Sequence, residues 1–259
     1  PTVLLTLQYM NYRVLFCFFA LSIIGCKSYE PLETKIDFIR VSEADVTADQ
    51  SIDATIAPYR SEMAEQMDVI IGELDTLLTK ERPESNLGNW LADMLLEEVN
   101  EILPDRPVDF SVQNQGGIRV INVAPGPITI GEVFEVMPFD NKVAVITATG
   151  AETKVFFDHL ARGRGWPVSA GTSFKIKDGK AIDIKINGTP LIDENIYRFA
   201  IPDYIANGGS GSDFLRDYER EDVNRLIREL FVEHIEEDTA DSIIQTAQKE
   251  GRIINTDHE

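Results

Sequence analysis

Three short segments of the sequence carry side chains suited to holding a planar, anionic ligand. In the first, Asn114 and Arg119 flank the pair Gly116 and Gly117. Glycines let backbone amides approach a ligand closely, and an arginine offers paired donors to ribose or phosphate oxygens. A motif this short is more often a simple glycine turn than a binding site. Both interpretations therefore stay open at this point.

The other two segments each contribute an aromatic side chain. Phe139 follows a proline in the turn 137–141, and Tyr204 precedes the glycine-rich stretch 207–211. An aromatic ring on a loop can stack on a base, which is worth ~1–3 kcal/mol per base. Core packing is the more common role of a lone Phe. Two aromatics on separate loops could nevertheless clamp one base between them.

Regular elements must position these loops. Alternating apolar residues predict a strand at 108–113 before the first loop and strands at 143–147 and 197–201 beside the other two. Thr129, with Glu132 three residues later, predicts a capped helix start. The spacing also predicts strands at 35–41 and 68–72, helices at 51–66, 86–103, 151–161, 220–237 and 239–250, and a hairpin at 173–186 around Asp178-Gly179.

This alternation of strands and helices predicts one α+β domain with a mixed β-sheet and flanking helices. Four motifs then point to a family, at 84–89, 114–119, 138–139 and 203–209. Their order and spacing resemble the C-terminal, substrate-binding domain of 5'-nucleotidases and UDP-sugar hydrolases. The resemblance extends over residues 51–215, and the segment 165–171 is similar to that family's loop before its central hairpin.

The resemblance implies a role for each matching position. Phe139 and Tyr204 would sandwich the base, Asn114 would reach its edge, and Arg119 would bind the ribose and phosphate region. Arg82 lies near the place of a second such arginine, but Pro83 shifts the spacing there. The implied substrate-binding residues are Asn114, Gly116, Gly117, Arg119, Phe139, Tyr204, Gly208, Gly209, Ser210 and Arg82. The 84–89 motif is expected to form and cap a helix start.

Two departures from the family pattern narrow the expected function. Family members carry an aspartate for the ribose hydroxyls where this chain has Ser210, and a serine makes weaker, uncharged hydrogen bonds. Two-domain members also have a metallophosphoesterase domain upstream. In this sequence His159, His234 and His258 are too far apart for a short-spaced metal motif. We therefore expect no catalytic residues, metal ligands or cofactor in this chain.

The expected function is nucleotide or nucleoside binding within a 5'-nucleotidase-type phosphohydrolase system, with a separately encoded metallophosphoesterase supplying divalent metals. The alternative is a solitary surface lipoprotein that captures nucleosides or nucleotides without chemistry. A net charge of -20, from 44 acidic and 24 basic residues, repels polyphosphate backbones. Nucleic acid is therefore not an expected partner.

The N-terminal residues have the pattern of a targeting signal. A charged start followed by an apolar run at 14–24 predicts a lipoprotein signal peptide at 10–25. Cys26 would then be the lipidated first residue, with 1–9 a non-native extension, 26–34 a tether and 35–259 the folded domain. Several acyl chains on one cysteine would hold the protein on a bacterial membrane, facing the periplasm or the cell exterior.

Overall fold

The central sheet of the computed structural model, which describes residues 49–257, has four strands in the order β11-β6-β10-β3. These strands are β11 (Glu219–Leu226), β6 (Lys142–Thr149), β10 (Ile196–Pro202) and β3 (Phe110–Ser111). β6 runs antiparallel to both neighbours, whereas β10 and β3 are parallel. The sheet is therefore mixed, as the sequence predicts. The expected strand at 35–41 and Cys26 lie outside the described residues.

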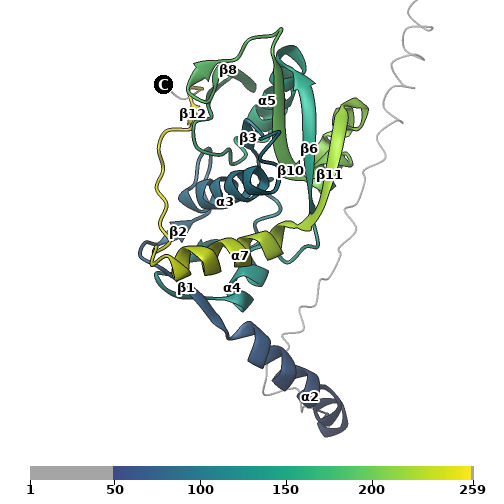
Figure 1. The fold of residues 1–259 in the computed structure, drawn as a ribbon, viewed down its shortest axis with the longest axis vertical. Helices are drawn as coiled ribbons and strands as arrows, with labels where there is room; N and C mark the ends of the chain where they lie inside the picture. The colour runs from purple at the N-terminus through teal and green to yellow at the C-terminus, as the bar shows by residue number, and fades with distance from the viewer. Residues whose placement is uncertain (1–48, 258–259) are drawn as a thin grey trace, which may run out of the picture. The chain divides into compact units, whose positions relative to one another are not determined.

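This sheet separates two apolar cores because its middle strands are buried on both faces. Along β6, Val143 and Val145 belong to one core, while Ala144 and Ile146 belong to the other. Successive side chains of a strand point to opposite faces, so one apolar run serves both sides. The first core packs against α3 (Asn86–Ile102), α4 (Ile130–Val136) and α7 (Ile227–Ala240), and the second against α5 (Gly150–Arg162). Figure 1 shows α3 above α7, and the two helices contact each other.

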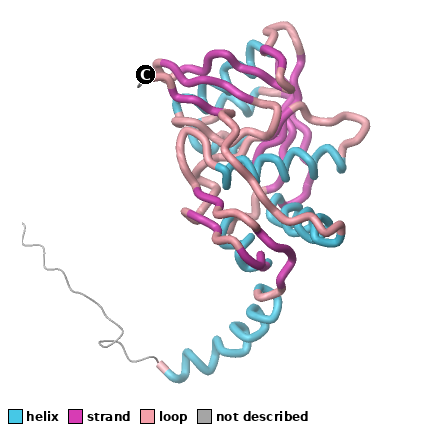
Figure 2. The backbone as a smooth tube through the Cα atoms, turned by 90° about the vertical axis from the view of Figure 1, so that its left-hand side faces the viewer, coloured by secondary structure: helices cyan, strands magenta, loops and turns pink. Residues whose placement is uncertain are grey.

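Smaller sheets complete the α+β fold. A second four-stranded sheet has the order β12-β7-β8-β9, and two-stranded sheets pair β1 with β5 and β2 with β4. The strands, magenta in Figure 2, thus form several sheets and not one. Their bounds are β1 Ile70–Leu74, β2 Leu78–Thr79, β4 Asn122–Val123, β5 Gly126–Thr129, β7 Ser173–Lys177, β8 Lys180–Ile186, β9 Thr189–Pro190 and β12 Ile253–Asn255.

Several predicted local signals are confirmed. Thr129 caps α4, and its side chain and that of Glu132 form a capping box. The hairpin of β7 and β8 turns at Asp178 and Gly179, which have φ of 50° and 69°. Both residues are left-handed, which suits the tight turn that Asp-Gly pairs favour.

The motif at 84–89 forms the start of α3, as the sequence predicts. Ser85 is the N-cap, and its side chain accepts a hydrogen bond from the Gly88 amide. A Cβ on Gly88 would lie 2.4 Å from the Pro167 ring, so only glycine allows the loop at 165–171 to pack this closely. Asn89 and Glu84 then fasten the returning C-terminal segment: Asn89 donates to the Gln248 carbonyl, and Glu84 accepts from backbone amides at 250 and 251.

Of the two predicted helices near the C-terminus, the one at 220–237 is confirmed only from Ile227 onward, and the one at 239–250 is wrong. Residues 219–226 form β11, the edge strand on β6, and the helix starts only at Ile227. The charged sequence of β11 has helical propensity, but tertiary pairing overrides it, and charge is typical of an edge strand. Residues 243–250 are not helical either, since Ser242 turns left-handed with φ 63° and ends the helical path. The chain then runs alongside α3, where the Gln245 side chain accepts from the Trp90 indole.

Helix α2 (Gln50–Met67) confirms the predicted helix at 51–66 and continues through Pro58. None of its residues is buried. Among the residues that the structure describes, no helix has both the length and the apolar composition needed to cross a bilayer. Residues Ala54–Glu259 form one compact unit.

Candidate nucleotide-binding pocket

A pocket of about 330 Å³ gathers most of the residues that the sequence singles out. This volume lies at the lower end of the range of small-molecule sites, about 300–1,000 Å³. Its lining consists of Asn114, Gly116, Gly117, Arg119, Phe139, Asn141, Tyr204 and Ser210. Seven of these were expected from the sequence, and Asn141 was not. Three loops far apart in the sequence therefore meet at one place.

The central sheet explains why these loops meet. The parallel strands β3 and β10 both end at the same edge of the sheet, and the antiparallel strand β6 begins there, since Pro202 pairs with Val143. The 114–119 loop follows β3, Tyr204 follows β10, and the 137–141 turn leads into β6. The order and direction of these strands thus bring all three loops to the same edge of the sheet.

The Asn114 loop is a tight turn with little room for side chains. The Gly117 amide donates to the Asn114 carbonyl at 2.9 Å, and a Cβ on Gly117 would lie 2.7 Å from Asn114 Oδ1. Asn114 is buried, and its Oδ1 has no hydrogen-bond partner among the described residues. A buried acceptor without a partner costs about 1–3 kcal/mol. The loop therefore holds a polar group that a ligand or a water molecule could satisfy.

Arg119 and Phe139 form one wall of the pocket. The guanidinium carbon of Arg119 lies 5.6 Å from the centre of the Phe139 ring, and the Arg119 amide donates to the Val136 carbonyl at 2.8 Å. The Phe139 side chain is 41% exposed, although it is large and apolar. Core packing thus does not account for this Phe, part of whose ring stays open to solvent in the pocket.

Tyr204 and the glycine-rich loop form another part of the pocket wall. Tyr204 is 48% exposed, and its hydroxyl accepts from the Ser210 amide at 3.3 Å. A Cβ on Gly209 would lie 2.5 Å from the Tyr204 ring, so this glycine lets the loop pack directly on the tyrosine. Gly208 has φ 89°, a left-handed conformation in which glycine is favoured. Neither glycine lines the pocket, but both shape its wall.

The pocket wall contains no carboxylate among the described residues. Ser210 stands in it with φ 57° and ψ 25°, at the position where the family resemblance implies an aspartate. Asp213, three residues later, forms an ion pair with Arg216 at 3.1 Å and does not line the pocket. The polar groups facing a ligand are therefore neutral or positive.

Arg82 does not line the pocket, so the structure does not bring it together with the other predicted residues. Its guanidinium donates to the Gly163 carbonyl and, at 3.4 Å, to the Gly165 carbonyl. Lys80, two residues earlier, donates to the Ile118 carbonyl at 2.6 Å, directly beside Arg119. Burial, followed by the charges of Arg119 and Arg82, lowers the pKa of Lys80. The sequence analysis missed Lys80, because nothing in the spacing of residues marks a contact with a carbonyl 38 residues away.

Two larger hollows lie elsewhere, over the β7-β8-β9 sheet. Their volumes are about 460 and 490 Å³. Lysines and aspartates line both hollows, and in the first of them Lys175 pairs with Asp183 at 2.9 Å. Neither hollow combines two exposed aromatic rings with a cation that lacks an acidic partner. The smaller pocket is the better candidate on its chemistry.

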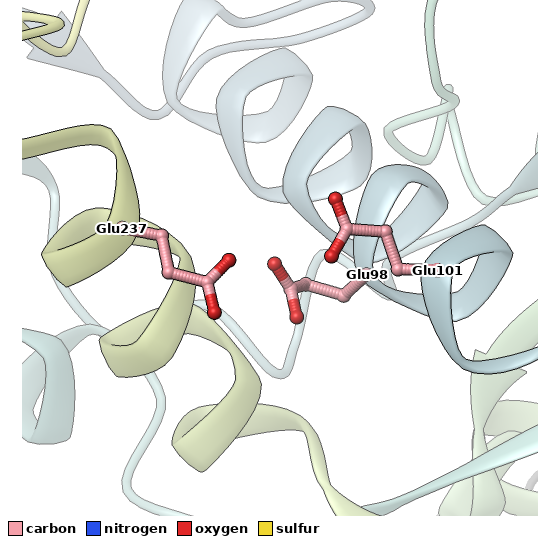
Figure 3. A group of neighbouring side chains, drawn as sticks. All are labelled: Glu98, Glu101 and Glu237. Atoms are coloured by element: carbon pink, nitrogen blue, oxygen red, sulfur yellow. The ribbon is translucent and has the colours of Figure 1, made fainter. Parts of the chain in front are cut away.

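A cluster of titratable side chains lies where α3 and α7 contact each other. The carboxylates of Glu98, Glu101 and Glu237 turn toward one another across these helices (Figure 3). One carboxylate oxygen of each residue lies within 4.8 Å of one from each of the other two. Glu98 is buried and pairs with His234 Nδ1 at 2.9 Å. Burial lowers the pKa of His234, but the hydrogen bond that its ring donates to Glu98 and the charges of Asp238, Glu98 and Glu97 outweigh this effect, so the net shift is upward. Three carboxylates alone do not identify a metal site on so acidic a protein.

The comparison with known families agrees with this geometry. The model of the 5'-nucleotidase C-terminal domain matches residues 70–217. That range covers more than half of the chain and includes every pocket residue. The chain therefore belongs to the 5'-nucleotidase C-terminal domain family, as the resemblance of its motifs predicts.

Individual relatives place the chain against larger proteins. It is 28% identical over 176 residues to Protein UshA of Escherichia coli, with 64% of this chain and 30% of UshA covered. It is 30% identical over 198 residues to the trifunctional nucleotide phosphoesterase protein YfkN of Bacillus subtilis, with 68% of this chain and 13% of that protein covered. The crystal structure of a 5'-nucleotidase precursor from Thermus thermophilus matches with TM-score 0.67 and 27% identity, covering 83% of this chain and 45% of that one. The chain thus spans about a third or less of the curated relatives named here.

Proposed function

We propose that this domain binds a nucleotide, with the base between Phe139 and Tyr204 and the ribose and phosphate toward Arg119. The observation that carries the proposal is the pocket itself: two exposed aromatic rings and an arginine, delivered by three separate loops, line one cavity without a carboxylate. Stacking on the rings is worth ~1–3 kcal/mol per base. In this proposal Asn114 contacts the edge of the base, which is supported by its position in the pocket lining and by its side-chain oxygen without a partner among the described residues.

The domain then acts as the substrate-binding part of a 5'-nucleotidase-type phosphohydrolase. Names of relatives such as 5'-nucleotidase and nucleotide phosphoesterase support this setting. We propose that a separately encoded metallophosphoesterase supplies the divalent metals that activate water and phosphate. Cys26 would anchor the protein by lipid on the extracytoplasmic side of a membrane, where nucleotides from outside the cell are met.

Calorimetry and an activity assay test this function together. The purified chain should bind AMP with a single site and should release no phosphate from it in the presence of Mn²⁺ or Zn²⁺. Adding a metallophosphoesterase encoded beside its gene should then give hydrolysis that a Phe139→Ala variant slows.

Two outcomes would overturn parts of the proposal. No heat of binding with adenosine, AMP or UDP-glucose at millimolar concentration would end the nucleotide role. Phosphate release by the pure chain would end the partner role. AMP binding without stimulation by any such partner would instead support a solitary capture protein.

A further inference from the structure

The turn at 137–141, which carries Phe139, needs an anchor because it belongs to neither a helix nor a strand. Helix α7 supplies an anchor at its first residue, Ile227, whose amide donates to the Asn141 carbonyl at 2.9 Å. Asn141 itself lines the pocket. A backbone hydrogen bond therefore joins the start of α7 to the pocket wall.

Arg228, the next residue of α7, contacts the same turn through its side chain. Arg228 Nη2 donates to Asp140 Oδ1 at 2.7 Å, and the guanidinium carbon lies 3.9 Å from the centre of the Phe134 ring on α4, beside α7 (Figure 1). Asp140 is the only ion-pair partner of Arg228 among residues 49–257. The Arg228 side chain is only 11% exposed, and a buried charge is unfavourable unless it is paired. The guanidinium is thus confined between one aromatic ring and one carboxylate.

This contact is better suited to fixing a position than to stabilising the fold. The Asp140 side chain is 79% exposed, and ion pairs with so exposed a partner contribute little to stability. Asp140 directly follows Phe139 in the chain, so a restraint on its carboxylate also restrains the neighbouring ring. The planar guanidinium of Arg228 stacks on a ring and binds a carboxylate at once, which leaves it few other orientations.

A bulge in β11 brings the start of α7 beside this turn. β11 pairs with β6 through Asp222, and the register then shifts before Leu226 pairs with Lys142, the first residue of β6. Asn224 within the bulge is left-handed, with φ 57°, and accepts from Lys142 Nζ at 2.6 Å. Bulges redirect a strand and are frequent beside functional sites.

We propose that Arg228 is a positioning residue for nucleotide binding, which holds the Phe139 ring in place for stacking through its contact with Asp140. The inference rests on the proposed function and extends it to a part of the chain outside the family match at 70–217. Arg228 does not line the pocket, so in this role it acts on the ligand only through the turn. Loss of either partner should free the turn and weaken binding of the base, with or without a phosphate.

The test is calorimetry with adenosine and with AMP on Arg228→Gln, Asp140→Asn and the double variant of the full chain. Each single variant should weaken the binding of both ligands about three- to tenfold, which is part of the roughly 5- to 150-fold expected when one stacking ring is lost. The double variant should lose no more than either single variant, because both break the same contact. The two substitutions change the net charge in opposite directions. A purely electrostatic effect would therefore have opposite signs for AMP and would leave adenosine binding unchanged.

A second readout separates positioning from a general effect on the fold. When Phe139 is already replaced by Ala, Arg228→Gln should change the affinity for AMP by less than about twofold, because the ring that Arg228 positions is absent. Urea titrations check that each variant folds. Asp140→Asn alters only an exposed side chain, so it still tests the proposal if Arg228→Gln does not fold.

Arg225→Gln is the matched control, since it removes the same charge three residues earlier, and Arg225 pairs with Glu233 on α7 and not with a pocket loop. It should bind both ligands as the unmodified chain does. Three results would overturn the positioning role and leave the nucleotide function standing: unchanged affinity in either single variant, opposite effects of the two on AMP, or an undiminished loss on the Phe139→Ala background. If the unmodified chain binds neither ligand, the proposed function fails and this inference fails with it.

Discussion

Replacing Phe139 by Ala should weaken nucleotide binding without weakening the fold. The ring is 41% exposed, so its removal leaves no core cavity, and exposed substitutions of this kind change stability by about 0.5 kcal/mol or less. Binding loses the stacking of one ring, ~1–3 kcal/mol. At about 1.4 kcal/mol per factor of ten, the dissociation constant for AMP should rise about 5- to 150-fold.

The assay is calorimetry with AMP on four variants of the two rings and one control variant. Phe139→Ala and Tyr204→Ala should each weaken binding, and the double variant should lose less than the sum, because both rings contact the same base. Tyr204→Phe keeps the ring and removes only the hydroxyl that accepts from Ser210, so it should bind almost normally. Tyr59→Ala is the matched control, since this aromatic is 68% exposed and lies outside the pocket. The reasoning is refuted if Phe139→Ala binds AMP as tightly as Tyr59→Ala does.

Three further substitutions test other parts of the structure. Gly209→Ala should weaken AMP binding about tenfold or more by calorimetry, because its Cβ would meet the Tyr204 ring at 2.5 Å; unchanged affinity would contradict the packing of that wall. His234→Gln should cost about 1–3 kcal/mol of unfolding free energy at pH 6. Since the pKa of His234 is raised from 6.5 by its acidic neighbours, that cost should shrink as the pH rises above this value in urea titrations, and a cost independent of pH would exclude the ion pair. Asp93→Ala removes the carboxylate that the buried Arg252 binds through two hydrogen bonds of 2.6 and 2.7 Å. It should lower the unfolding free energy by about 3–5 kcal/mol in the same titrations. A loss below about 1 kcal/mol would show that the pair is dispensable.

Sequence patterns predict the parts of this fold that depend on local signals. Capping residues predicted the starts of α3 and α4, and Asp178-Gly179 predicted the hairpin turn. They failed where tertiary contacts decide the structure. The charged segment of β11 becomes a strand only because β6 offers it an edge, and residues 243–250 follow an extended path because Trp90, Asn89 and Glu84 supply hydrogen-bond partners.

The pocket residues were predictable for a different reason. Two of their motifs follow the strands β3 and β10 and the third precedes β6, and the pairing of these strands brings the three loops together. The positions of Lys80 and Arg82 could not be predicted in the same way, because their side chains are held by backbone carbonyls of distant turns. Spacing in the sequence contains no trace of those contacts.

A crystal structure of the protein soaked with AMP would test the central claim most directly. We predict density for the adenine ring between Phe139 and Tyr204, with the phosphate on the Arg119 side of the pocket. Density for the nucleotide at another place, or an unchanged pocket at a concentration where calorimetry shows saturation, would contradict the account.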